Sequence, residues 1–541
     1  MRYKDNWALR VLRKAAEYTE DTIMLKNFRR SLTDLVGEDY INHVCAASSA
    51  LTGESEAALR AVADTEVDCC PSWYIDRQEA LMQRIGETIA PAYESRLAGA
   101  PTAAFRAAQV NAIAPQAGFG CFRVGEDGRL YFAGKSEHYH IPLGHYFPGF
   151  ALIEHAKRIG VANATHNNAR GYITRLTEAS LIAAANGLAA PDAPEMEELL
   201  GKCEPGVLNR VINIETGSLA VEAALKMMLA RFYPFDKNDA PYAGRIPVFL
   251  VMADNAGGIT AGYHGTTIWA QSMRGLWPTL REKAGEGGLY RVEGVPINDE
   301  AGFAEALARW NTPPYKVAGF CHEIILMNYG GILLTESFLK SAYKLCRESD
   351  TPVLCDEIQS CAWYEGLFLF RRYGIQPDFV SIGKGFPDGN YPASRLMFSA
   401  AFDNLSQFGA LVTNGQEELA SLTYLISMEF MRVNGAHVTE VGSYYHQGEL
   451  ALAKKYPKLI HSVEGDAHMS TLNFVTVDEA VDFCRRLQKE SCIDISAQTY
   501  KPNCPPAVLT KLPIIATKEM LRILLEKYDK CLEKMEEEIH A

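Results

Sequence analysis

The chain has 541 residues, of which 48% are hydrophobic and 22% charged, as in ordinary soluble globular proteins, and its length predicts two or three domains. The net charge of −13, with no local basic block, argues against a nucleic-acid partner. No apolar run reaches the length of a membrane span, and the amino-terminal residues lack the apolar core of a secretory signal. We therefore expect a protein without a membrane or nucleic-acid partner.

The 13 cysteines are scattered and include no pair of CxxC motifs. Cys69 and Cys70 are adjacent, which is a poor geometry for a zinc site or a disulfide framework. Free cysteines are commonly buried as small apolar side chains. This usage predicts no metal site and a reducing, cytoplasmic location.

Residues from about 6 to 100 have a helical pattern, with apolar side chains at spacings of three and four between Leu81 and Ile89. This region carries no phosphate-binding or dinucleotide-binding motif. We assign residues 1–115 to a helical amino-terminal extension. It could be an added layer, a dimer arm or a lid that covers the mouth of a pocket and restricts substrate size.

A hairpin is predicted from Gly120 to Phe132, because two apolar runs flank the turn residues Glu126-Asp127-Gly128. From about residue 150 to 400, helical patterns alternate with short apolar runs. That alternation predicts a mostly parallel sheet covered by helices, in a large α/β domain over residues 116–404. The clearest runs are Val248–Val251, Ile324–Met327 and Val353–Leu354, with a helix over Ser337–Glu348 between the last two.

After about residue 405 the pattern changes. We expect a long helix near Glu417–Arg432, strands near Leu459–Ile460 and Leu472–Val475, and a final helix from its cap Thr517 to about Glu538. These elements predict a smaller α+β domain over residues 405–541.

One pair of residues suggests chemistry. The apolar run Val353–Cys355 ends in Asp356, and the run Phe379–Ile382 is followed by Gly383 and Lys384. If both runs are parallel strands, the acid and the amine emerge at the same sheet edge, where α/β proteins bind ligands. An amine and an acid there suit pyridoxal 5'-phosphate, because the amine can form a Schiff base while the acid keeps the ring nitrogen protonated.

Four further segments accompany that pair. Their order along the chain resembles that of the class-III aminotransferases, within fold type I of the pyridoxal-phosphate enzymes. The resemblance covers roughly residues 205 to 535, more weakly 120 to 200, and not the first hundred. The segments are Asn213–Lys226, Gly262–Thr267, Cys321–Met327 and Leu411–Gln416.

The resemblance implies a mostly parallel central sheet flanked by helices, with a smaller carboxyl-terminal α+β domain and an amino-terminal helical extension. It implies a homodimer with shared active sites that moves an amino group from an amine or amino acid to an oxo acid. Thr216, Gly217 and Ser218 would bind the cofactor phosphate at a helix start, where backbone amides favour anions. Tyr263 would stack on the ring, and His264 belongs to the same segment.

The remaining roles also follow from the resemblance. Lys384 would form the Schiff base, Asp356 would pair with the ring nitrogen, and Gln359 would reach the ring hydroxyl. Glu323 would be a second acid near the ring or substrate. Thr413 would contact the phosphate in the neighbouring subunit's site.

The chain departs from the family pattern at Leu219, at Thr266 and over Ser360–Tyr364, and no proline follows Glu323. A non-catalytic homologue of the same fold therefore stays open. A racemase, decarboxylase or aminomutase is a further alternative, because these reactions share the lysine, acid and phosphate site. A nicotinamide-binding protein is disfavoured, since Gly118-Phe119-Gly120 lacks the third glycine.

A substrate carboxylate would call for a cation, preferably the guanidinium fork of arginine. No arginine falls on an alignable motif, and the segment that resembles the family's last strand contains only a lysine. The candidates are Arg170, Arg175, Arg274, Arg395, Lys501 and Lys511.

Overall fold

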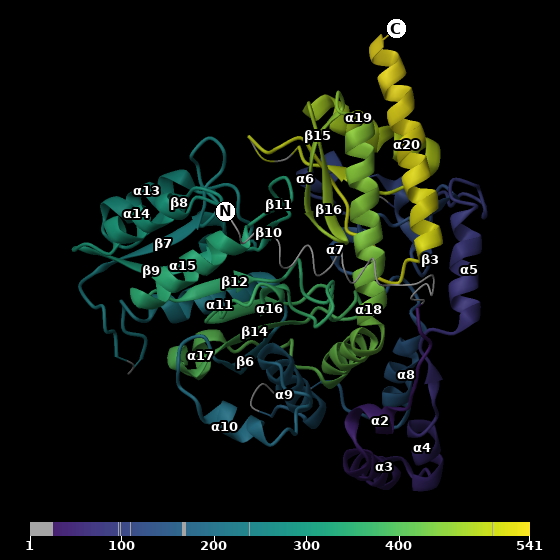
Figure 1. Ribbon diagram of the computed structural model, residues 1–541. Helices are drawn as coiled ribbons and strands as arrows, with labels where there is room; N and C mark the ends of the chain where they lie inside the picture. Colours follow the sequence, from purple (N-terminus) through teal and green to yellow (C-terminus); the bar gives the residue numbers. More distant parts are fainter. Residues whose placement is uncertain are drawn as a thin grey trace, which may run out of the picture.

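A computed structural model describes residues 25–540 apart from 96, 98, 109, 165–168, 237–238, 500 and 502 (Figure 1). The part of the predicted amino-terminal helices before residue 25 lies outside the described residues. The centre is a seven-stranded sheet with the order β6-β14-β13-β12-β9-β7-β8. Its strands are β6 (Leu208–Ile214), β7 (Ile246–Met252), β8 (Arg291–Val295), β9 (Tyr315–His322), β12 (Val353–Asp356), β13 (Phe379–Ile382) and β14 (Ser394–Ser399).

The sheet is mostly parallel, as expected. The pairs β12–β13, β12–β9, β9–β7 and β7–β8 are parallel, whereas β14 runs antiparallel to both β13 and β6. Both faces are buried: Phe249 and Val251 of β7 pack into one apolar cluster, and Val248 and Leu250 into another. Burial on both sides explains why these strands read as continuous apolar runs.

Helices cover the two faces of the sheet (Figure 1). The predicted helix over Ser337–Glu348 is confirmed as α15, whose start is capped by Thr335 and whose buried side chains include Phe338, Leu339 and Ala342. The other helices around the sheet are α9 (Tyr172–Asn186), α10 (Glu195–Gly201), α11 (Gly217–Leu229), α12 (Ile268–Ser272), α13 (Pro278–Glu286), α14 (Glu300–Trp310), α16 (Leu369–Arg372) and α17 (Gln407–Ala410).

The carboxyl-terminal part is α+β, as expected. A four-stranded antiparallel sheet has the order β15-β16-β18-β17. One helix departs from the prediction: it continues from Glu418 to Lys455 instead of ending near Arg432. The elements are α18 (Glu418–Lys455), β15 (Ile460–Asp466), β16 (Met469–Phe474), α19 (Val477–Ser491), β17 (Ser496–Ala497), β18 (Ala507–Leu509) and α20 (Lys518–His540).

The amino-terminal part is mainly helical where it is described. It contains β1 (Arg29–Arg30), α2 (Leu32–Val36), α3 (Glu38–Thr52), α4 (Glu56–Ala63), β2 (Val67–Asp68), α5 (Ser72–Met82) and α6 (Ala103–Ala108). The predicted hairpin is present as β4 (Phe122–Gly125) and β5 (Leu130–Phe132), and β3 (Pro115–Phe119) pairs with β4. The short helices α7 (Ser136–Tyr139) and α8 (Ala151–Arg158) follow.

Buried side chains from all three parts of the chain belong to one continuous apolar cluster, for example Tyr74, Val353 and Leu521. The division at residues 115 and 404 therefore stays a prediction. The thirteen cysteines are all free, and all but Cys203 and Cys504 are buried. A search of the described helices for one with the length and hydropathy of a bilayer span finds none.

Candidate active site

Asp356 and Lys384 emerge at the same edge of the central sheet. Asp356 is the last residue of β12 and pairs in register with Ser381 of the parallel strand β13. Lys384 follows the end of β13, with a φ of 35°, a left-handed backbone conformation that is costly for a residue with a side chain. Strand order and direction thus place the acid and the amine at one ligand-binding edge.

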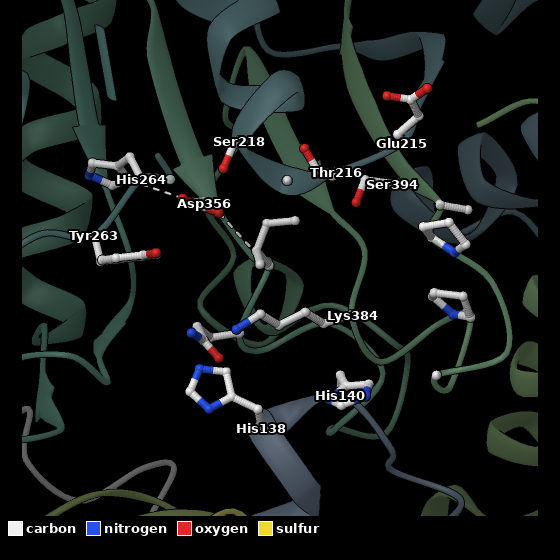
Figure 2. Close-up of a pocket in the computed structure, with 18 of the residues that line it drawn as sticks. His138, His140, Glu215, Thr216, Ser218, Tyr263, His264, Asp356, Lys384 and Ser394 are labelled. Atoms are coloured by element: carbon white, nitrogen blue, oxygen red, sulfur yellow. Dashed lines mark hydrogen bonds and ion pairs between the residues drawn. The ribbon is translucent and has the colours of Figure 1, made fainter. Parts of the chain in front are cut away.

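A cavity of about 470 Å³ opens at this edge (Figure 2). It brings together nine of the ten residues that the sequence predicts for the site. Thr413 is the exception, because its exposed side chain lies in the segment before α18 and does not line the cavity. The nine are Thr216, Gly217, Ser218, Tyr263, His264, Glu323, Asp356, Gln359 and Lys384.

The Asp356 carboxylate is buried and held by three groups. Its Oδ1 accepts hydrogen bonds from the Ser381 hydroxyl at 2.6 Å and the Ile358 backbone N–H at 3.2 Å. Its Oδ2 lies 3.0 Å from Nδ1 of His264, whose Nε2 is buried without a hydrogen-bond partner among the described residues. These contacts fix the carboxylate at the cavity wall, and Figure 2 shows the one between His264 and Asp356.

Glu323 is a second buried acid. Its Oε2 accepts a hydrogen bond from the Tyr263 backbone N–H at 3.1 Å, and its Oε1 has no partner among the described residues. Burial, reinforced by the nearby Asp356 charge, raises the pKa of Glu323 to about 7. Glu323 can therefore hold a proton near neutral pH.

Lys384 is a partly buried amine. Burial lowers its pKa, while Glu323 and Asp356 act in the opposite direction. A lowered pKa increases the fraction of free amine, which is the nucleophilic form. Figure 2 shows His138 beside Lys384, and burial followed by the lysine charge lowers the pKa of His138 to about 4, so its imidazole is uncharged at neutral pH.

The start of α11 forms an anion site. Thr216 caps the helix and its hydroxyl accepts a hydrogen bond from the Leu219 N–H at 3.4 Å. Gly217 is required by a close approach, since a Cβ there would lie 2.4 Å from Cδ1 of Ile358. The Ser218 hydroxyl accepts from the Thr266 N–H at 3.0 Å. Two hydroxyls and the free amides of a helix start favour a phosphate.

The candidate carboxylate-binding cations differ in whether they contact the cavity lining or are bound to other protein groups. Arg395 is fully buried and donates to the carbonyl oxygens of Ser394 and Gly415, so it is committed to the protein interior. Arg274 stacks on the cavity-lining Tyr263, with its guanidinium carbon 4.7 Å from the ring centre. The others bind protein groups: Arg170 binds Glu178, Arg175 the Gly171 carbonyl, Lys501 the Thr260 carbonyl and Lys511 the Tyr139 carbonyl.

The sequence prediction missed one wall of the cavity. His138 and His140 come from the segment around α7, where Ser136, Glu137 and Tyr139 all have positive φ. No helix or strand periodicity marks such a segment. Other lining residues belong to or lie near the segments that the sequence singled out, without an individual role predicted for them: Glu215, Gly265, Ile358, Pro387, Gly389, Tyr391, Pro392, Ala393 and Ser394.

The donor set fits pyridoxal 5'-phosphate. An anion site, a flat aromatic side chain and a clamped carboxylate surround one amine, within a volume suited to a small ligand. Gly217 leaves room for Ile358, whose apolar side chain lies between the helix start and the lysine loop. Glu323 and His264 line the cavity, and Glu323 Oε1 and His264 Nε2 find no hydrogen-bond partner within the described part of the chain.

The family model for class-III aminotransferases matches residues 104–532. The ornithine aminotransferase of Bordetella pertussis is 26% identical over 393 residues, which cover 71% of this chain and 84% of that protein.

Two solved structures show the same fold. The ornithine aminotransferase of Toxoplasma gondii superposes with a TM-score of 0.60 at 19% identity, over 79% of this chain and 91% of that one. An engineered thermostable omega transaminase gives a TM-score of 0.63 at 17% identity, over 82% and 98% of the two chains.

Proposed function

Since the chain belongs to the class-III aminotransferase family and is therefore a pyridoxal-phosphate-dependent aminotransferase, we propose that the cavity at the end of β12 and β13 is its active site. The observation that carries this proposal is the placement of Asp356 and Lys384 on one sheet edge, facing the anion site at the start of α11. Lys384 is the residue that carries the cofactor.

When bound, the cofactor supplies the electron sink that amino-group transfer requires. Lys384 contributes an amine whose pKa is lowered by burial. Its Nζ could take the proton from the donor carbon that bears the amino group and, in the second half-reaction, deliver a proton to the corresponding carbon of the acceptor. Asp356 supplies the negative charge that keeps the ring nitrogen protonated. Ser381 and His264 hold that carboxylate in position.

The other lining residues bind and orient. Thr216, Gly217 and Ser218 would hold the phosphate, and Tyr263 would lie against the ring. His264 acts through Asp356, Gln359 donates to the ring hydroxyl, and Glu323 supplies a proton-holding group near neutral pH.

The substrates are an amino donor and an oxo-acid acceptor. Arg274 is the arginine we assign to a substrate carboxylate, because it contacts Tyr263 at the cavity. Ornithine is the first donor to test, since two of the three proteins compared above are named ornithine aminotransferases.

We also infer a homodimer in which Thr413 reaches the partner's phosphate site. What supports this is that Thr413 is exposed and lies outside the cavity lining of its own chain, as a residue of a shared site would. The thirteen free cysteines support a cytoplasmic location.

In the first experiment, the protein is purified in the presence of added cofactor and is then reduced with borohydride. We expect visible absorbance that is lost on reduction, and a cofactor-modified peptide containing Lys384. Lys384→Arg, which keeps the charge, should lose the modification and at least about a thousand-fold in activity. Modification of a different lysine, or unchanged absorbance in Lys384→Arg, would overturn the assignment.

A further inference from the structure

A second buried lysine lies directly behind the cavity wall. Lys511 follows β18, and none of its surface is exposed. Its Nζ lies 3.7 Å from the ring centre of Trp363. Lys511 forms no ion pair with a carboxylate among the described residues, so its fixed place must serve something other than charge pairing.

The Lys511 amine joins two walls of the cavity. It donates to the backbone carbonyl of Tyr139 at 3.2 Å and to the side-chain oxygen of Gln359 at 3.4 Å. The Lys511 backbone carbonyl accepts a hydrogen bond from the Ser136 hydroxyl at 2.6 Å. One residue thus bridges the segment that carries His138 and the loop that follows Asp356.

The contact with Gln359 decides which end of its amide faces the cavity. Gln359 is buried and lines the cavity, and its oxygen is turned toward Lys511. A side-chain amide has one acceptor end and one donor end. With the oxygen occupied by Lys511, the NH₂ group is the end left for the cavity.

We propose that Lys511 is a positioning residue of the active site, which holds the Gln359 amide so that its NH₂ group can donate a hydrogen bond to an oxygen of the bound cofactor. This inference rests on the proposed function, because it assumes that the cofactor occupies this cavity. Lys511 touches neither cofactor nor substrate and acts through Gln359.

The groups that face Lys511 come from several elements, and the test must allow for their titration. Burial and the neighbouring Lys384 lower the pKa of Lys511 well below its ordinary value. Removing Lys511 could therefore act through charge as well as through Gln359. The facing groups are His138, His140, Glu323, Cys361 and Lys384.

The experiment measures the pH midpoint of the visible absorbance of the holoenzyme. A donor at the ring oxygen draws electron density from it and weakens its hold on the shared proton, so losing the donor should raise the midpoint by about one pH unit. We expect this rise in Lys511→Met and in Gln359→Met. In the double variant, we expect the midpoint to rise by no more than it does in Gln359→Met alone.

Lys316→Met is the matched control. Lys316 is also a buried lysine, and it donates to the Ser349 carbonyl at 3.0 Å near the start of β9, outside the cavity lining. Its removal should lower thermal stability and leave the midpoint unchanged. The proposal would be overturned if Lys511→Met left the midpoint unshifted. It would also be overturned if Lys511→Met raised the midpoint of Gln359→Met by as much as it raises the midpoint of the wild type.

A second variant covers the case in which Lys511→Met does not fold. Gln359→Glu keeps Lys511 and replaces the donor with an acceptor, so the midpoint should again rise, and an unchanged or lower midpoint overturns the proposal. Failure of the proposed function gives a different result, since the wild-type protein would then show no cofactor absorbance to titrate.

Discussion

A substitution of Asp356 tests directly whether the negative charge at the sheet edge is needed for the reaction. Asp356→Asn preserves size and some of the contacts to Ser381 and Ile358 but removes the negative charge. We expect the rate of the amino-donor half-reaction, followed by absorbance, to fall by about 100-fold or more while the cofactor stays bound.

Ser381→Ala is the control for that variant, because it removes one hydrogen bond and keeps the charge. Its rate should fall by less than about tenfold, in line with the loss of one contact. Equal rates for Asp356→Asn and wild type would show that the carboxylate does not act on the cofactor.

The sequence predicts the site residues that terminate strands or begin a helix. Asp356 and Lys384 follow apolar runs, and Ser218 lies in a helix start, so local pattern is enough to find them. His138 comes from a segment without periodicity, and tertiary contacts alone bring it to the cavity. Lys511 was named as a candidate for a substrate carboxylate, but it lies outside the cavity lining and donates to the Tyr139 carbonyl. The roles of all these residues stay predictions until the variants are measured.

At the scale of elements, most strands and helices were predictable, but two expected bounds were wrong. The run Ile324–Met327 was expected as a strand of the parallel sheet. The sheet strand is β9, which ends at His322, and only Ile325–Leu326 of the run is a strand, paired antiparallel with Ile332–Leu333 outside the central sheet.

The helix α18 was expected near Glu417–Arg432, and the next residues include Asn434-Gly435, a pair typical of turns. The helix continues, and a Cβ at Gly435 would lie 2.8 Å from Cγ of Glu365, so this glycine allows close packing. The sequence alone does not distinguish a glycine that allows close packing inside a helix from a glycine that ends the helix. The distinction depends on the segment that packs against it.

The same helix carries a buried acid that should make stability depend on pH. Glu449 has no exposed surface, and burial raises its pKa to about 7, although the hydroxyls of Ser470 and Tyr445 offset part of the cost. A raised pKa means that the folded state binds the proton more tightly. The stabilisation is therefore full below the ordinary pKa of 4.5 and is lost as pH rises through about 7.

Glu449→Gln should remove this dependence. Relative to the variant, the unfolding free energy of the wild-type apoprotein should fall by about 3 kcal/mol between pH 4.5 and pH 8, at about 1.4 kcal/mol per pKa unit. Chemical denaturation at several pH values measures the difference. The exposed Glu533 of α20, changed to Gln, is the control and should give curves parallel to wild type. Parallel curves for Glu449→Gln would contradict the prediction.

At the scale of the whole molecule, the amino-terminal segment was expected to be a layer, an arm or a lid. No described residue between 25 and 95 lines the cavity. The helix α5 instead supports the cavity wall from behind: Gln78 accepts a hydrogen bond from the Cys121 N–H at 3.0 Å, and the Tyr74 hydroxyl donates to the His145 carbonyl at 3.4 Å. His145 in turn binds Glu137, next to His138.

This arrangement predicts a structural role for the segment. Deleting residues 1–95 removes the buried Leu81 and Met82 of α5, which should leave the part of α20 that contacts α5 without its partner in the core. We expect insoluble or unfolded protein, as judged by circular dichroism. Gln78→Ala should lower the unfolding free energy by about 1–3 kcal/mol, because it orphans a buried N–H. A folded deletion product with changed substrate range would instead support the lid.

The proposed homodimer can be tested at Thr413, which lies outside the cavity lining of its own chain. If Thr413 donates its hydroxyl to the partner's phosphate site, Thr413→Ala should weaken cofactor binding about tenfold, the loss expected for one hydrogen bond to a charged group. Thr413→Ser keeps the hydroxyl and should bind as wild type does. Cofactor affinity is measured by equilibrium titration and oligomeric state by light scattering. Because Thr413 is exposed and outside the cavity of its own chain, an effect of Thr413→Ala that Thr413→Ser lacks requires a second subunit. A monomer that binds the cofactor fully would refute the shared site.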